Sequence, residues 1–133
     1  KKEFVFNFDQ DSNPKKISKS IEIVYGLRNF IGNANKFAKN TIFINLKSDS
    51  EITEITVEDD GDGYPRDIIS KIGEPYLKSN YSKDKSKEGL GLGLFIGKTL
   101  LEKNFASVNC RNSRTRNGAE VVIRWKNKEL FNI

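Results

Sequence analysis

Three polar residues with helical spacing are the first candidates for chemistry in this chain. Asn29, Asn33 and Lys36 stand at positions i, i+4 and i+7 of an otherwise largely apolar segment, so they would form one row along a helix. Asparagine is a poor residue for a helix interior because its amide competes for backbone hydrogen bonds. One explanation for the row is an ordinary solvated face. The other is a site for a divalent cation and phosphate, because amide oxygens and an ammonium group suit those ligands.

Two glycine-bearing segments are further candidates, and each also has an ordinary structural explanation. The segment 59–63 (DDGDG) follows an apolar run, and glycine there would let a ligand approach the backbone. Its first acid, Asp59, could accept a hydrogen bond from an exocyclic amine, but a plain acidic turn would look the same. The segment 89–93 (GLGLG) precedes a helical stretch, so its amides and a helix N-terminus would face an anion. A run of capping glycines would also look like this.

Two better-known phosphate-binding motifs do not fit the second glycine segment. A Walker P-loop that ends with residues 97–99 (GKT) would need its first glycine at Leu92, and Lys98 falls inside the predicted helix. A dinucleotide fingerprint would need a third glycine at Leu94 or Ile96. Both interpretations therefore fail.

Composition narrows the classes of function. The chain contains no histidine, which excludes an imidazole triad, a histidine metal ligand and a phosphate-accepting histidine within it. The single cysteine, Cys110, excludes an internal disulfide and a multi-cysteine zinc site, and this fits a reducing compartment. No apolar run approaches the ~20 residues of a membrane span, and no segment resembles a signal peptide. The net charge of +5 permits an anionic partner.

Hydrophobic periodicity predicts one α+β domain over residues 1–133. Alternating apolar residues predict strands over 3–8, 41–47, 54–58, 106–112 and 119–125. Helical patterns predict helices over 21–40, 65–72 and 90–103. The core face of the first helix is predicted to contain Ile23, Val24, Leu27, Ile31, Ala34 and Ala38. Residues 73–89 lack periodicity and are expected to form a mobile lid. This order predicts a two-layer α/β sandwich, with a mixed, mostly antiparallel sheet of about five strands and three helices on one face.

Taken together, the candidate segments resemble the catalytic ATP-binding domain of sensor histidine kinases, which has the Bergerat fold of the GHKL superfamily. The N, G1, F and G2 boxes of that family correspond, in order and at family spacing, to residues 29–36 (NFIGNANK), 59–63 (DDGDG), 72–76 (IGEPY) and 89–94 (GLGLGL). Gly118 would supply the last glycine motif. The resemblance covers about residues 20–125. The segments GEPY and GLGLGLFI also resemble the redox-responsive, RegB-like subgroup.

The resemblance implies a site for ATP and Mg²⁺. It implies that Asn33 ligates Mg²⁺ with Asn29 beside it, and that Lys36 contacts phosphate, so these three residues would be catalytic. Phe37 would lie beside adenine, and Asp59 would accept a hydrogen bond from the adenine N6 amine. The other residues implied to bind the nucleotide are Gly61 and Gly63 near the base, Ile72, Tyr76 and Lys78 in the lid region, and Gly89, Leu90, Gly91, Leu92 and Gly93 at the lid hinge.

Three positions depart from the family pattern. Gly73 stands where a phenylalanine is common, Leu90 where serine or threonine is common, and Ala119 where threonine is usual. These departures bring lid docking and one phosphate hydrogen bond into question, but they leave nucleotide binding intact.

The residue at position 29 bears on the reaction. Related hydrolysing ATPases carry a glutamate there that acts as a base on water, and the amide of Asn29 cannot take that proton. The resemblance therefore implies transfer of the γ-phosphoryl group to a histidine, which would lie on a separate helical dimerisation domain. A response regulator would act downstream. The parent protein would be anchored in the bacterial inner membrane, with this domain in the cytoplasm.

Other classes of function stay open at this point. The fold is shared with ATP-hydrolysing switches of the gyrase or chaperone kind, with serine kinases of the anti-sigma type, and with pseudokinases that bind nucleotide without transferring phosphate. A nucleic-acid-binding module is disfavoured, because its basic residues would have only two neighbouring aromatic residues for base stacking. Those basic residues would be Lys78, Lys83, Lys85 and Lys87, and the aromatic residues Tyr76 and Tyr81.

Overall fold

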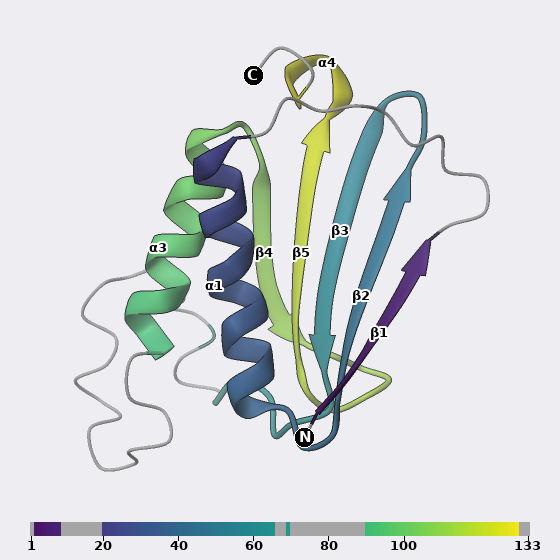
Figure 1. The fold of residues 1–133 in the computed structure, drawn as a ribbon, viewed down its shortest axis with the longest axis vertical. Coiled ribbons are helices and arrows are strands. Elements are labelled where there is room, and N and C mark those ends of the chain that lie inside the picture. Colours follow the sequence, from purple (N-terminus) through teal and green to yellow (C-terminus); the bar gives the residue numbers. More distant parts are fainter. Residues whose placement is uncertain (1, 9–19, 66–68, 70–89, 131–133) are drawn as a thin grey trace.

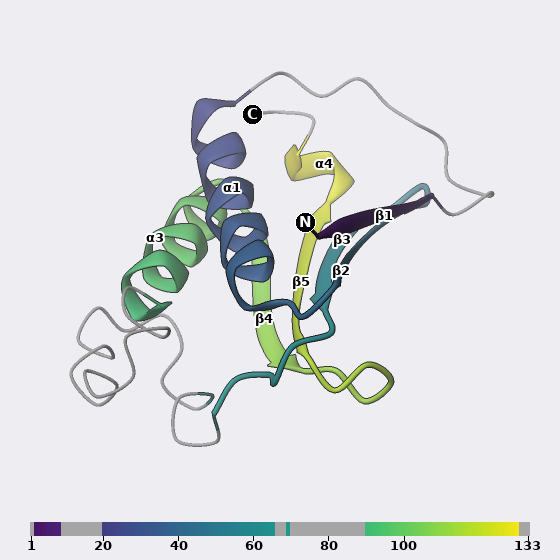
Figure 2. The same cartoon turned by 60° about the horizontal axis from the view of Figure 1, so that its bottom comes forward.

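The computed structural model describes residues 2–8, 20–65, 69 and 90–130 of the chain. Two helices, α1 and α3, pack on one face of a five-stranded sheet (Figures 1 and 2). The predicted α+β sandwich is confirmed. The predicted helix over 65–72 lies largely outside the described residues, and a short third helix, α4, was not predicted. Among the helices that the structure does describe, none has both the length and the apolar character needed to cross a membrane.

The strands and helices have the following bounds. The strands are β1 (Glu3–Phe8), β2 (Thr41–Ser48), β3 (Ile52–Asp59), β4 (Ser107–Asn112) and β5 (Ala119–Lys126). The helices are α1 (Ile21–Phe37), α3 (Leu90–Lys103) and α4 (Asn127–Leu130). The strand order is β1-β2-β3-β5-β4. β1 is parallel to β2 and the other neighbours are antiparallel.

Helix α1 ends three residues earlier than predicted, and the reason is a carboxylate on the loop that follows β3. Asp60 Oδ1 accepts hydrogen bonds from the backbone nitrogens of Lys39, Asn40 and Thr41, at 2.8, 3.0 and 3.2 Å. These amides therefore have a partner outside the helix, and the chain turns into β2. The link fixes the end of α1 beside the loop that follows β3.

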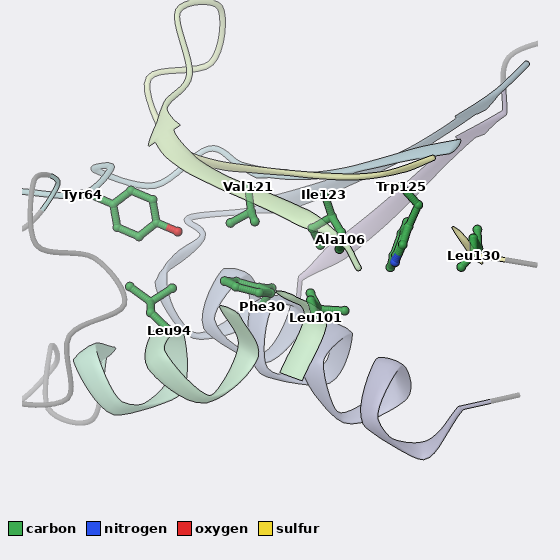
Figure 3. Packing of buried hydrophobic residues seen from close by; sticks show 9 residues of the cluster. All are labelled: Phe30, Tyr64, Leu94, Leu101, Ala106, Val121, Ile123, Trp125 and Leu130. Carbon is green, nitrogen blue, oxygen red and sulfur yellow. The ribbon is translucent and has the colours of Figure 1, made fainter. Parts of the chain in front are cut away.

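The core lies between the sheet and the two long helices. Its main cluster includes Phe30 of α1, Leu94 and Leu101 of α3, and Ile123 and Trp125 of β5 (Figure 3). A second cluster joins Ala34, Ala38, Ile42 and Val57. Full burial of a large aliphatic or aromatic side chain in these clusters stabilises the folded state by about 1.5–3 kcal/mol.

The predicted core face of α1 is partly wrong. Ala34 and Ala38 are buried as expected, but Val24 is 37% exposed, and the residues that are buried instead include Gly26 and Phe30. The helix is thus rotated about its axis relative to the prediction. Periodicity could not predict this rotation, because the rotation depends on where α3 packs. The side chain of Leu101 fills the space that a side chain at position 26 would take.

Candidate functional site

The row of asparagines on α1 faces the first turn of α3. A Cβ placed on Gly93 would lie 3.3 Å from Nδ2 and 3.5 Å from Oδ1 of Asn33, and 3.8 Å from Oδ1 of Asn29. Both asparagines are half-buried, so the solvated-face explanation does not hold for them. The Asn29 amide is oriented by a 2.8 Å hydrogen bond from its Nδ2 to the carbonyl oxygen of Tyr25.

Asn33 carries a buried donor without a partner. Its Nδ2 is the sole buried side-chain nitrogen or oxygen that lacks a hydrogen bond in the described part of the chain. Leaving such a group unpaired costs roughly 1–3 kcal/mol, so the arrangement indicates a position that a ligand or water completes. The same side chain offers an oxygen that suits Mg²⁺ and a donor that suits a phosphate oxygen.

A small hollow lies next to Asn33, between α1 and the sheet. It is lined by Phe30, Asn33, Ala34, Phe37, Val57, Asp59, Gly63, Tyr64, Ala119 and Val121. Its volume is about 20 Å³, which is room for about one water molecule. A purine ring would therefore enter only as some of these side chains move apart.

Asp59 closes the sheet side of the hollow. The residue is 3% exposed, and its Oδ1 accepts hydrogen bonds from the backbone nitrogens of Gly61 at 2.8 Å and Ala119 at 3.3 Å. Burial raises the pKa of this carboxyl, the two backbone bonds lower it, and the charges of Asp60 and Glu58 raise it further, so that the net shift is upward. No described donor reaches its Oδ2, which is the oxygen that could accept from an amine.

Two glycines let the backbone pass close to Asp59. A Cβ on Gly118 would lie 1.9 Å from the carbonyl oxygen of Asp59, and a Cβ on Gly61 would lie 2.3 Å from that of Phe37. Real Cβ atoms do not come this close to backbone atoms, so both positions need glycine for this packing. The ends of α1, β3 and β5 meet here as a result.

The other predicted site residues fall into three groups. Gly91 lies with Leu90 and Leu92 in the first turn of α3, beside Gly93. Lys36 is exposed and stands outside the hollow, with its Nζ 5.3 Å from the ring centroid of Phe37. The residues Ile72, Tyr76, Lys78 and Gly89, the expected lid over 73–89, and the other lysines of a nucleic-acid surface lie outside the described residues.

Sequence reasoning missed several residues of the hollow and its surroundings. Phe30 follows Asn29 directly, and Tyr64 follows Gly63, so an aromatic residue next to each motif was the available signal. Asn112, which holds the backbone of Tyr64, has no signal in the sequence, because the two residues are 48 positions apart.

Comparison with known proteins places this geometry in a family. The family model described as "Histidine kinase-, DNA gyrase B-, and HSP90-like ATPase" matches residues 18–129. The chain belongs to this family. Among curated members, the sensor histidine kinase RegB of Cereibacter sphaeroides is 40% identical over 97 residues, which are 69% of this chain and 21% of RegB. The chain thus spans about a fifth of that relative's length. The predicted membership, including the RegB-like resemblance, is confirmed.

Two solved structures share the fold of this chain. The mycobacterial sensor histidine kinase MprB superposes with a TM-score of 0.71 at 21% identity, covering 93% of this chain and 80% of that one. Full-length ShkA in complex with AMPPNP gives a TM-score of 0.68 at 22% identity, covering 92% of this chain and 25% of that one. At this identity the likeness concerns the fold alone.

Proposed function

We propose that this domain binds Mg²⁺-ATP and transfers the γ-phosphoryl group to a histidine on a separate helical dimerisation domain, in two-component signal transduction. The observation that carries the proposal is the unpaired, buried Nδ2 of Asn33, which lies between the hollow closed by Asp59 and the first turn of α3. Membership of the ATPase family supports it. A relative, ShkA, is described in complex with AMPPNP, which supports nucleotide binding here.

Each part of the nucleotide has a group that suits it. Asp59 would accept a hydrogen bond from the N6 amine of adenine, and Phe37 lines the same hollow. Asn33 would hold Mg²⁺ through its amide oxygen, and the first turn of α3, with Gly91 and Gly93, would present backbone amides to the phosphates. When bound, Mg²⁺ neutralises phosphate charge, and phosphoryl transfer depends mainly on such neutralisation and on positioning. Exposed Lys36 would add a positive charge.

The amide at position 29 favours transfer over hydrolysis. The Nδ2 of Asn29 is held by the carbonyl of Tyr25, so its oxygen is the end of the amide nearest to Gly93. An amide oxygen is not a base that can take a proton from water at neutral pH. A separate acceptor is then required, and because the chain has no histidine, the acceptor would belong to another domain of the parent.

The wider setting is part of the same proposal. Residues 1–133 would form one catalytic domain on the cytoplasmic side of a parent protein that is anchored in the bacterial inner membrane. The partners would be the helical domain that carries the histidine and, downstream, a response regulator. Nucleic acid is not expected to bind.

Binding of ATP to three variants tests the site. Asp59→Ala should weaken ATP binding at least about tenfold, because a hydrogen bond to a charged group contributes about 1.5–3 kcal/mol. Asn33→Ala should remove the dependence of ATP binding on Mg²⁺. Asn35→Ala is the matched control, since Asn35 is exposed on the same helix. Calorimetric titration with and without Mg²⁺ measures both effects, and unchanged binding in the first two variants would refute the site.

Phosphoryl transfer needs its own experiment. Wild-type domain, labelled ATP and the separately purified helical domain of the parent should give an acid-labile phosphohistidine on the helical domain. Replacement of the acceptor histidine should abolish the label. A label that is acid-stable, as on serine, or release of phosphate without any labelled protein would contradict the proposed reaction.

A further inference from the structure

We propose that Asn112, at the end of β4, is a positioning residue for the wall of the base-binding hollow. It is not expected to touch the nucleotide itself. The inference rests on the proposed function, because it assigns a role within that same site.

The side chain of Asn112 makes two hydrogen bonds to the backbone of one residue. Its Oδ1 accepts from the nitrogen of Tyr64 at 2.6 Å, and its Nδ2 donates to the carbonyl oxygen of Tyr64 at 3.0 Å. A neighbouring strand would satisfy a backbone donor and acceptor in the same way. The amide thus continues the edge of the sheet beyond the point where β4 ends.

The segment that Asn112 holds is the wall of the hollow next to Asp59. Gly63 and Tyr64 both line the hollow, and Gly63 has a φ of +80°, which L side chains rarely adopt. Tyr64 is buried, with its ring between the sheet and Leu94 of α3 (Figure 3). In the described part of the chain, the two bonds to Asn112 hold the backbone of Tyr64 to the sheet. A side-chain hydrogen bond between Tyr64 and Cys110 of β4 holds its hydroxyl group.

Asn112 itself is exposed at the edge of the sheet, so its contribution to folding is expected to be modest. Its effect should instead concentrate on the loop that it holds. Without the two bonds the loop has more conformations to lose when a base enters, and preorganisation of this kind improves affinity by lowering that cost. The affinity of the site for the base should therefore depend on Asn112, whereas its affinity for the phosphates should not.

The chemistry also predicts the behaviour of a conservative variant. An aspartate at this position keeps an acceptor for the Tyr64 nitrogen but, when ionised, turns a second oxygen towards the Tyr64 carbonyl. The protonated acid regains a donor there. The adenosine affinity of Asn112→Asp should therefore be lower than that of the wild type at neutral pH. The difference from the wild type at the same pH should become smaller as the pH falls through the pKa of the new carboxyl.

The experiment separates the two ends of the ligand. Affinities for adenosine, for Mg²⁺-tripolyphosphate and for Mg²⁺-ATP are measured for the wild type, Asn112→Ala, Asn112→Asp and the control Asn109→Ala. Asn109 is exposed on the same strand and pairs with Val122 of β5. Asn112→Ala should bind adenosine and ATP about fivefold more weakly, the equivalent of one net hydrogen bond, and should bind tripolyphosphate normally. Asn109→Ala should match the wild type.

The possible results distinguish failure of the positioning role from failure of the proposed function. Unchanged adenosine affinity in Asn112→Ala, or equal losses for adenosine and tripolyphosphate, would overturn the positioning role while leaving the proposed function standing. A wild-type domain that binds neither adenosine nor ATP would overturn the proposed function itself. Circular dichroism establishes that each variant is folded. If Asn112→Ala does not fold, the pH dependence of adenosine binding by Asn112→Asp takes its place, and a loss without recovery at acidic pH would overturn the inference.

Discussion

At the scale of single residues, the carboxyl of Asp59 combines a structural cost with the binding role proposed for it. Its Oδ1 accepts hydrogen bonds from the backbones of Gly61, in the loop after β3, and Ala119, at the start of β5. The group is nevertheless almost fully buried, and burial raises its pKa above the ordinary value. A buried ionised group that has no cation beside it destabilises the fold. The residue is therefore retained at a cost in stability, as is common at functional sites.

The variant Asp59→Asn should expose this cost. Because the pKa is raised in the folded state, the folded protein binds the proton more tightly than the unfolded chain does, and the wild type loses stability as the pH rises from about 3.9 through the raised folded pKa. The variant lacks this loss, so its free energy of unfolding relative to the wild type should increase across that range. Denaturant unfolding at a series of pH values measures the difference. A difference that stays constant with pH would contradict the assignment.

Phe105 offers a second prediction at this scale. It follows α3 with a φ of 72° and is 58% exposed, so its backbone is strained without a compensating buried side chain. Phe105→Gly should raise the free energy of unfolding by about 1 kcal/mol, since a left-handed conformation costs an L residue roughly 1–2 kcal/mol and glycine very little. The control is Asn117→Gly, where φ is 64° and asparagine already tolerates the conformation. Equal effects of the two substitutions would contradict this explanation.

At the scale of elements, the contact between α1 and α3 decides the geometry of the site. The helices run antiparallel, so that Gly93 meets Asn33 at one end and Leu101 meets Gly26 at the other. Between them Gly97 lies against the ring of Phe30, where a Cβ would approach a ring carbon to 2.8 Å. Glycine in a helix interior costs about 1 kcal/mol relative to alanine, and this close packing offsets that cost.

Two glycine substitutions test that argument. Gly32→Ala should stabilise the domain by about 1 kcal/mol, because α1 gains a better helix former and a Cβ there meets nothing within 4 Å. Gly97→Ala should lose this gain and destabilise the domain by about 1–3 kcal/mol through overpacking against Phe30. It should also weaken the Mg²⁺ dependence of ATP binding, since α3 must shift away from Asn33. Thermal unfolding and calorimetry measure both effects. If Gly97→Ala is more stable than the wild type, the ring of Phe30 moves aside at little cost, and the explanation by overpacking is wrong.

The elements themselves were largely predictable, and their mutual packing was not. Alternation predicted all five strands to within about two residues, and the start of α3 at Leu90 was predicted from its apolar pattern. The rotation of α1 and the role of Asn112 depend on contacts between residues far apart in sequence, which local periodicity does not contain. The asparagines and Asp59 could be chosen as candidates because their residue types are unusual for the elements that carry them.

At the scale of the whole molecule, one tryptophan reports on the core that the site shares. Trp125 is 2% exposed, and its indole nitrogen donates to the carbonyl oxygen of Asn104 at 3.1 Å. It belongs to the same cluster as Phe30, which lines the hollow. Unfolding followed by its fluorescence should therefore coincide with unfolding followed by circular dichroism.

ATP should shift both transitions together. At a concentration of 100 times Kd, Mg²⁺-ATP should add about 2.7 kcal/mol to the free energy of unfolding. The Asp59→Ala variant should show a smaller shift at the same concentration because it binds more weakly. Two separate transitions, or a shift seen by only one probe, would mean that the site and the core do not unfold as one unit.

The groups that surround the hollow belong to different layers of the sandwich. Asp59 and Ala119 come from the sheet, whereas Asn33 and Gly93 come from the helices. A molecule held at both ends would act as a cross-brace between the layers, and any fluctuation that separates the helices from the sheet would first have to release it. Amide hydrogen exchange should consequently slow along the whole of α1 and α3 on nucleotide addition, well beyond the amides in contact with it.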